Sequence, residues 1–341
     1  MKRESFGSRL GFILVSAGCA IGIGNVWKFP YICGAYGGAA FILIYLCFLV
    51  ILGIPVLVAE FAVGRGSHTS VAKCFDKLAP AGSCWKPLKF IGIIGCYMLM
   101  MFYTTVGGWM IYYCVKSLRG DFVGATPEAV TQSFSDMLGN APTMMLWMVI
   151  ICLIGFAVCF MGLQNGIEKI SKVMMSALLI IMVILAVHSV MMEGAGEGIR
   201  FYLIPDFQKI KEAGVGNVVF AALSQSFFTL SIGIGAMLIF GSYLDKSRSL
   251  TGEAVSITVL DTFVALTAGF IIIPACFSYG IQPDAGPSLV FITLPNIFAK
   301  MSGGALWGSL FFLFLTFAAV STIIAVSVSY THLRAHETRG N

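Results

Sequence analysis

Runs of apolar residues long enough to cross a lipid bilayer follow one another through this sequence. A transmembrane helix needs ~20 such residues. Eight runs meet that length, at roughly 10–35, 40–63, 88–115, 143–161, 168–191, 216–241, 254–280 and 304–328. Only 11% of the 341 residues are charged, against ~25% in a typical soluble domain. We therefore predict an all-α membrane protein.

The basic residues lie in the loops between these runs and predict the orientation of the chain. With a cytoplasmic N-terminus, the inner loops carry about twice as many Lys and Arg residues as the outer loops, as the positive-inside rule requires. The net charge of +5 is thus a topology signal and indicates no nucleic-acid partner. We predict a multi-pass protein of the cell membrane, surrounded by the lipid bilayer, with its N-terminus in the cytoplasm.

Glycines interrupt the first apolar run at its centre. Gly18, Gly22 and Gly24 precede Asn25 in SAGCAIGIGNVW. Irregular backbone within a membrane is tolerated only where it lines a cavity. A helix broken here would leave free carbonyls, which suit a cation, and free amides, which suit a carboxylate. The alternative is a helix-packing face, because Gly18 and Gly22 have small-xxx-small spacing.

The sixth run is interrupted in a similar way. Its polar residues and glycines are Gln225, Ser226, Thr229, Ser231, Gly233 and Gly235. Two glycine-interrupted helices, five spans apart, are typical of transporters built from inverted repeats, in which substrate and ions bind at the interruptions. The pair therefore favours a transport site over simple helix packing.

The second, seventh and eighth runs contain further oxygen ligands. Asp261, in ITVLDTFVAL, is costly in a membrane and is expected to face a cavity, an ion or a counter-charge such as Lys28. Ser321 and Thr322 either bond carbonyls one turn back or bind a cation, and hard oxygen ligands of this kind suit Na⁺. Glu60, near the inner end of its run, is expected to be a structural acid paired with a nearby base.

Several segments closely resemble the neurotransmitter:sodium symporter family, which includes bacterial leucine and tryptophan transporters. They are SRLGFILVSAGCAIGIGNVWKFPYICGAYGGAAF, GIPVLVAEFAVGRGS, SFFTLSIGIGA and LVFITLPNIF. The resemblance covers residues 3 to about 326. It implies an inverted-repeat transporter fold of the bacterial leucine transporter type, with discontinuous helices 1 and 6 and about 8 of the family's 11–12 transmembrane helices.

The resemblance also implies a domain organisation. One transporter domain, 1–328, would hold a first repeat at 10–191 and a partial second repeat at 216–328. The polar segment 329–341 is predicted to be a non-native or frameshifted tail that does not continue the last helix. The segment SLVFITLPNIFAKM, 288–301, is too short to span and is predicted to be a helical hairpin over the outer face.

By the same resemblance, two Na⁺ sites are implied. The first would use the carbonyl of Ala20 and the side chains of Asn25, Thr229 and Asp261, together with the substrate carboxylate. The second would use the carbonyls of Gly18, Ile21 and Ala318 and the hydroxyls of Ser321 and Thr322.

The resemblance further implies a substrate site and two gates. The substrate carboxylate would meet the amides of Ile23 and Gly24 and the hydroxyl of Tyr103. Phe228 would close over the substrate from outside. The residues shaping its side-chain pocket would be Leu99, Ser231, Ile234 and Val326, and the gate residues would be Arg3, Phe6, Lys28 and Tyr243.

Two positions indicate the substrate class and the ion requirement. Gly22 stands where monoamine transporters of the family have an aspartate, which implies an α-amino acid that brings its own carboxylate. Asp261 stands where the chloride-binding animal members have an asparagine, which implies independence of chloride. Three positions depart from the family: Lys28 replaces an arginine and loses its bidentate geometry, Phe6 replaces a tryptophan, and Ser176 replaces a proline associated with unwinding of the fifth helix.

We therefore expect Na⁺-coupled symport of an α-amino acid, with an apolar side chain, by alternating access. No nucleophile, metal constellation or nucleotide loop indicates an enzyme. Two alternatives stay open: a proton-coupled transporter with Asp261 as the proton carrier, and a non-transporting receptor or partner subunit of the membrane. A homo-oligomer is compatible with either.

Overall fold

The computed structural model describes residues 6–281, 283 and 288–337, and the side chains of α16 as far as Ser327. These residues form helices and connecting turns, with no strand among them. The helices are α1 (Arg9–Ala20), η1 (Gly24–Lys28), α2 (Phe29–Ala35), α3 (Ala39–Phe48), η2 (Leu49–Gly53), α4 (Ile54–Ser67), α5 (Val71–Leu78), α6 (Leu88–Arg119), α7 (Pro127–Gly139), α8 (Ala141–Phe160), η3 (Leu163–Glu168), α9 (Lys169–Val190), α10 (Ala195–Leu203), α11 (Phe207–Ala213), α12 (Val215–Thr229), α13 (Ala236–Gly241), α14 (Leu250–Ser278), η4 (Leu289–Thr293), α15 (Leu294–Lys300) and α16 (Gly304–Glu337).

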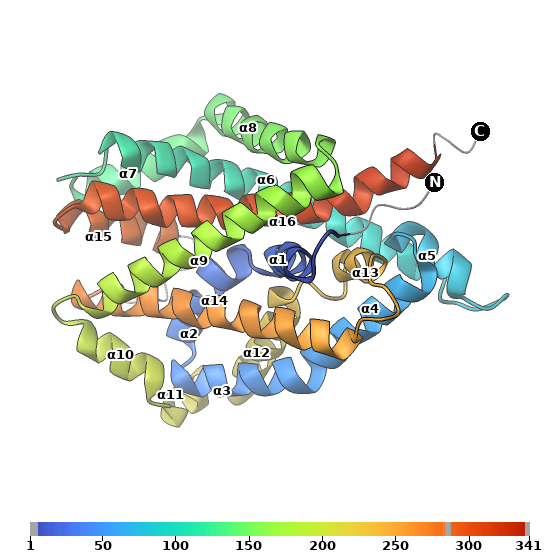
Figure 1. The fold of residues 1–341 in the computed structure, drawn as a ribbon. Helices are drawn as coiled ribbons and strands as arrows, with labels where there is room; N and C mark the ends of the chain where they lie inside the picture. Colours follow the sequence, from blue (N-terminus) through green and yellow to red (C-terminus); the bar gives the residue numbers. More distant parts are fainter. Residues whose placement is uncertain (1–5, 282, 284–287, 338–341) are drawn as a thin grey trace.

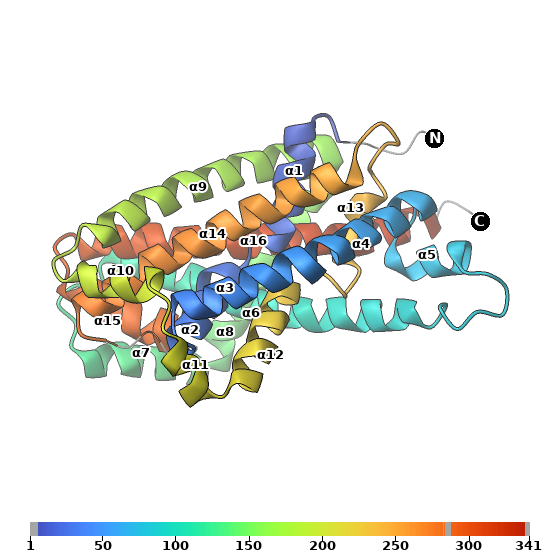
Figure 2. The ribbon, with the colours of Figure 1, turned by 90° about the horizontal axis from the view of Figure 1, so that it is seen from below.

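Long apolar helices run side by side through the bundle (Figures 1 and 2). Six helical stretches in the described chain are long and apolar enough to cross a membrane: Ala39–Ser67, Leu88–Arg119, Ala141–Phe160, Leu163–Val190, Leu250–Ser278 and Gly304–Ser327. The α5 segment lies at one end of the bundle, and α7, α10 and α15 lie at the other (Figure 1). The predicted all-α membrane fold is therefore confirmed.

The first and sixth predicted runs are the two that do not form continuous helices. In the first, α1 and the η1–α2 segment meet at 56°, on either side of Ile21 and Gly22. In the sixth, α12 and α13 are separated by 230–235, where Ser231, Gly233 and Gly235 have φ of 52°, 88° and 75°. Positive φ is disfavoured for residues with a Cβ, so the two glycines permit this path. The predicted discontinuous helices are thus both present.

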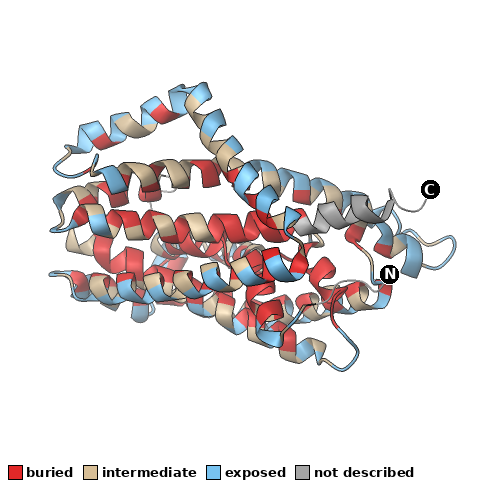
Figure 3. Ribbon diagram, turned by 45° about the horizontal axis from the view of Figure 1, so that its top comes forward, coloured by how far each residue is buried: buried red, intermediate tan, exposed pale blue. Residues whose placement is uncertain are grey.

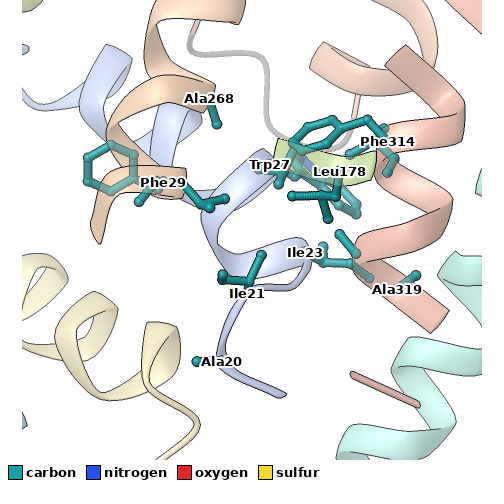
Figure 4. Packing of buried hydrophobic residues seen from close by; sticks show 14 of the residues in the cluster. Ala20, Ile21, Ile23, Trp27, Phe29, Leu178, Ala268, Phe314 and Ala319 are labelled. Atoms are coloured by element: carbon teal, nitrogen blue, oxygen red, sulfur yellow. The ribbon is translucent and has the colours of Figure 1, made fainter. Parts of the chain in front are cut away.

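The broken first span lies inside the bundle, against α14, α9 and α16. About 78% of the apolar window of α16 is buried, against 17% for α8, so α16 is a central helix and α8 a peripheral one. Buried residues follow the inner faces of the helices (Figure 3). Around the break, Ile23 lies on the side of Leu178 of α9 and Ala319 of α16, and all three belong to the buried core (Figure 4). Close packing of this kind fixes where the irregular backbone sits.

Two local predictions are corrected. The α16 backbone remains helical to Glu337, so the predicted end of the last helix near 328 was too early. The segment predicted to be a helical hairpin, 288–301, instead contains one continuous short helix, Leu289–Lys300. The α9 helix runs unbroken past Ser176, in agreement with the absence of a proline there, and the irregular turn of this span lies earlier, in η3.

Candidate functional site

Asp261 lies at the centre of a buried polar cluster that joins three helices. Asn25 Nδ2 donates to Asp261 Oδ1 at 2.7 Å and to its carbonyl at 3.1 Å. Thr229 Oγ1 donates to Asp261 Oδ2 at 2.8 Å. All three side chains are buried. The predicted counter-charge, Lys28, has no ion pair with Asp261 among the described residues, because its ammonium lies 4.2 Å from the Phe228 ring centroid.

A second oxygen cluster joins α1 to α16. Ser321 Oγ lies 3.0 Å from the Gly18 carbonyl and 2.9 Å from the Ala318 carbonyl. Thr322 Oγ1 lies 3.3 Å from the Gly18 carbonyl and 3.2 Å from the Ala318 carbonyl. Ile21, the fifth residue of the predicted second Na⁺ site, is buried at the C-terminal end of α1. The hydroxyls therefore reach across to α1 as well as bonding carbonyls of their own helix.

A cavity of about 670 Å³ lies beside the break in the sixth span. Its walls include five residues predicted for the substrate site, on α6 and the sixth span: Leu99, Tyr103, Phe228, Ser231 and Ile234. Val326, predicted for the same pocket, is buried in α16 and is not among the residues that line the cavity.

Glycines 22 and 24 allow close approach at the first break. A Cβ on Gly22 would lie 2.5 Å from the Tyr103 hydroxyl and 2.8 Å from Thr322 Oγ1. A Cβ on Gly24 would lie 2.6 Å from the Phe228 ring. The Tyr103 hydroxyl also lies beside the backbone of Ile23 and Gly24. The polar groups predicted to meet a carboxylate are therefore neighbours at the first break.

Three long-range contacts of the breaks were not predicted from sequence. Ser231 Oγ donates to the carbonyl of Cys19 at 3.0 Å, which links the sixth span to the first. Gln225 Nε2 donates to the carbonyl of Gly24 at 3.0 Å. Glu60 accepts from the amide of Gly233 at 2.6 Å. Within the described residues Glu60 has no ion pair with the base that was expected, and its carboxylate instead bonds backbone of the sixth span.

The predicted gate residues lie on both sides of the breaks. Lys28 and Phe228 form the cation–π contact described above. Phe6 packs edge-on against Tyr243, with ring centroids 5.6 Å apart, and also against Phe12 at 5.5 Å. Arg3 lies outside the described residues.

Two buried carboxylates hold the start of α1 against neighbouring helices. Glu168, at the end of η3, accepts from the Gly7 amide at 2.7 Å, Ser8 Oγ at 3.0 Å and Lys172 Nζ at 2.7 Å. Glu253, in the first turn of α14, accepts from Arg9 Nε at 3.0 Å. Sequence reasoning missed both, although a lone acid in a Lys-containing inner loop could have drawn attention to Glu168.

The comparison with known proteins identifies the family. The profile of the Sodium:neurotransmitter symporter family matches residues 3–129 and 128–333. The chain belongs to this family. The sodium-dependent transporter YhdH of Bacillus subtilis is 36% identical over 325 residues, which cover 95% of this chain and 71% of that protein. A sodium-dependent transporter of Haemophilus influenzae is 34% identical, covering 95% and 72%.

A solved symporter has the same fold. The crystal structure of MhsT in complex with L-phenylalanine superimposes with a TM-score of 0.88 at 37% identity, over 98% of this chain and 76% of MhsT. The chain described here is therefore a sodium-dependent membrane transporter and not an enzyme. Its oxygen clusters consist of hard ligands, and no group of three His, Cys, Asp or Glu side chains suits a metal site within the described residues.

Gly22→Ala is expected to weaken substrate binding by about five- to 150-fold, because the new methyl group would displace Tyr103 or Thr322 at an overpacking cost of about 1–3 kcal/mol. Gly216→Ala is the control, since a Cβ there would meet nothing within 4 Å. Its dissociation constant should stay within about two-fold of the parent. Equal dissociation constants for the two variants would contradict the role of Gly22.

Proposed function

We propose that this symporter carries an apolar α-amino acid together with Na⁺ by alternating access. The observation that carries the proposal is the convergence of Asn25, Thr229 and Asp261 at the two helix breaks. A carboxylate, an amide and a hydroxyl in a buried place supply the hard oxygen ligands that Na⁺ prefers. A buried carboxylate without a basic partner is also stabilised by a bound cation.

Two Na⁺ ions are proposed, one in each oxygen cluster. The first would lie among Asn25, Thr229, Asp261 and the Ala20 carbonyl. The second would lie among the oxygens of Gly18, Ile21, Ala318, Ser321 and Thr322. The first cluster joins the two halves of the first span, through Ala20 and Asn25, and the second joins α1 to α16, so the ions would stabilise the bent geometry at Ile21 and Gly22. Each charge that moves inward through 100 mV gains about 2.3 kcal/mol.

An α-amino acid is proposed because the first break can receive a carboxylate. The amides of Ile23 and Gly24 and the Tyr103 hydroxyl would supply the donors. A side chain at position 22 would collide with Tyr103 and Thr322, so the protein has no acid of its own at that position, and the substrate would bring the carboxylate. Leu99 and Ile234 give the cavity apolar walls. The related MhsT was crystallised with L-phenylalanine, which supports an apolar or aromatic side chain.

The proposed orientation has the start of α1 on the cytoplasmic side, with Phe6 and Tyr243 at the inner gate and Lys28 at the outer gate. The break at Ile21 and Gly22 gives α1 a hinge in the middle of the membrane, where no continuous helix resists bending.

Chloride is proposed to be unnecessary, because Asp261 already supplies a negative charge beside the first ion.

The deciding experiment is equilibrium binding of each of the twenty amino acids to the purified protein in Na⁺, with choline as the replacement cation. Binding of an apolar amino acid in Na⁺ alone supports the proposal. Equal binding in choline would remove Na⁺ coupling and favour the proton-driven alternative. Binding without uptake in proteoliposomes would favour a receptor.

Chloride independence is checked in the same assay by replacing chloride with gluconate. We expect the dissociation constant to change by less than about two-fold, because the Asp261 carboxylate needs no added anion to balance the first Na⁺. A ten-fold loss of binding in gluconate would overturn the proposed chloride independence, and it would leave the Na⁺ requirement intact.

A further inference from the structure

Ser231 lies in the turn that ends α12 and has an uncommon backbone conformation. The Ile232 amide donates to the Phe227 carbonyl at 3.3 Å, and the Ser231 amide donates to the Phe228 carbonyl at 3.2 Å. This pair of bonds is a Schellman motif, in which the residue at the position of Ser231 is left-handed and is most often glycine. Ser231 has a φ of 52°, which a residue with a Cβ disfavours. The serine therefore strains a turn that glycine would form without strain.

The hydroxyl of Ser231 offsets this strain through a bond to the first span. The end of a helix leaves carbonyls without partners in that helix, and inside a membrane they need partners from elsewhere. At the end of α1, the Ala17 carbonyl accepts from the Ile21 amide at 2.6 Å, and the Gly18 carbonyl is met by hydroxyls of α16. The Cys19 carbonyl accepts from Ser231 Oγ at 3.0 Å. Without this hydroxyl, a carbonyl buried beside the hinge would lose that bond.

Ser231 also lies between the two sites that the proposed function uses. It lines the substrate cavity, although only 9% of its surface is exposed. The Cys19 carbonyl that it holds is followed in the chain by that of Ala20, a proposed ligand of the first Na⁺, and then by the proposed hinge. An amino acid in the cavity would exclude water from the bond between Ser231 and Cys19. Because water competes for hydroxyls and carbonyls, its exclusion would strengthen that bond.

We propose that Ser231 is a positioning residue that couples the substrate cavity to the hinge of the first span. Its hydroxyl holds the end of α1 against the sixth-span break, and the contact requires the left-handed turn. An amino acid in the cavity stabilises the bond and the turn together, so its binding favours the arrangement in which α1 is closed. When α1 moves away, the hydroxyl loses its acceptor, and the bond no longer offsets the strain of the turn. This role depends on the proposed hinge motion of α1.

The test places a thiol reporter on α1. Ser16 is fully buried in α1, and its hydroxyl has no hydrogen-bond partner among the described residues, so Ser16→Cys is a mild change. The ten native cysteines are replaced by alanine, and the alkylation rate of the new thiol in nanodiscs then reports how often α1 opens. Ser231→Ala removes the hydroxyl and keeps the Cβ. We expect it to raise the rate in Na⁺ about ten-fold, because one buried carbonyl loses its bond. A parental rate would overturn the proposal.

Two further variants separate the hydroxyl from the strain of the turn. Ser226→Ala is the matched control, since Ser226 is a buried serine of the same span whose hydroxyl bonds the Leu223 carbonyl of its own helix at 2.8 Å. Its alkylation rate should stay within about two-fold of the parent. Ser231→Gly removes the hydroxyl and relieves the turn. It should therefore raise the alkylation rate as Ser231→Ala does, yet bind the amino acid at least about three-fold more tightly than Ser231→Ala. A parental alkylation rate in Ser231→Gly would assign the effect to strain alone and overturn the role of the hydroxyl.

Coupling to the substrate is a separate readout, which a merely structural role of Ser231 would not change. In the parent, the apolar amino acid that binds in Na⁺ should slow alkylation of the thiol at position 16. In Ser231→Ala, the factor by which the amino acid slows alkylation should fall at least about three-fold. An unchanged factor would overturn the coupling. The comparison of rates in Na⁺ alone needs no bound amino acid, so failure of the proposed transport function is distinguishable from failure of the role of Ser231.

Discussion

Asp261→Ala is expected to reduce Na⁺-dependent amino-acid binding at least about a hundred-fold. The carboxylate accepts hydrogen bonds from Asn25 and Thr229 at 2.7 and 2.8 Å in a fully buried place. Hydrogen bonds to a charged group contribute about 1.5–3 kcal/mol each, so losing two corresponds to at least a hundred-fold in a binding constant. The first Na⁺ would also lose its negatively charged ligand. Equilibrium binding of the labelled amino acid in Na⁺ and in choline measures the effect.

Asp261→Asn separates charge from shape. Asparagine keeps an acceptor for Asn25 and nearly the same volume, but it removes the charge that is proposed to make chloride unnecessary. We expect weakened binding in gluconate that chloride partly restores, whereas the parent protein should respond to neither anion. If Asp261→Ala binds the amino acid in Na⁺ with the same dissociation constant as the parent protein, the first ion does not use this carboxylate.

The sequence predicted those parts of the site that depend on local pattern. An acid within an apolar run has to be buried among partners, so Asp261 was recognisable by itself, and the glycines at 22, 24, 233 and 235 indicated where each helix breaks. Apolar length alone located the spans. The assignment of Tyr103 came only from the resemblance, because an aromatic residue in a membrane helix is ordinary by itself.

Other features depend on contacts between distant segments and were missed. Glu60 bonds the amide of Gly233, 173 residues away, because a broken helix leaves backbone donors that some side chain must satisfy. Ser231 reaches the Cys19 carbonyl for the same reason. No local pattern shows which partner an interrupted backbone will find.

Glu168→Gln is expected to increase the solvent access to the cytoplasmic side of the first break about ten-fold, because it loosens the start of α1. The Glu168 carboxylate holds the Gly7 amide, Ser8 Oγ and Lys172 Nζ, and Ser8 is also the N-cap of α1. A Cβ on Gly11 would overlap this carboxylate, so α1 and η3 are in close contact. Weakening charge-assisted bonds by about 1.4 kcal/mol in total shifts a two-state equilibrium ten-fold.

Cys19 is a suitable reporter of that shift. It is fully buried at the inner side of the break, so a thiol reagent reaches it only when α1 moves away. With the other cysteines replaced by alanine, the alkylation rate of Cys19 should rise about ten-fold in Glu168→Gln and fall again when Na⁺ and substrate are added, because bound ions favour the closed arrangement. Glu197→Gln, an exposed acid on α10, should leave the rate unchanged. If Glu168→Gln is folded and its Cys19 reacts at the parental rate, the carboxylate stabilises the local helix start without restraining the motion of α1.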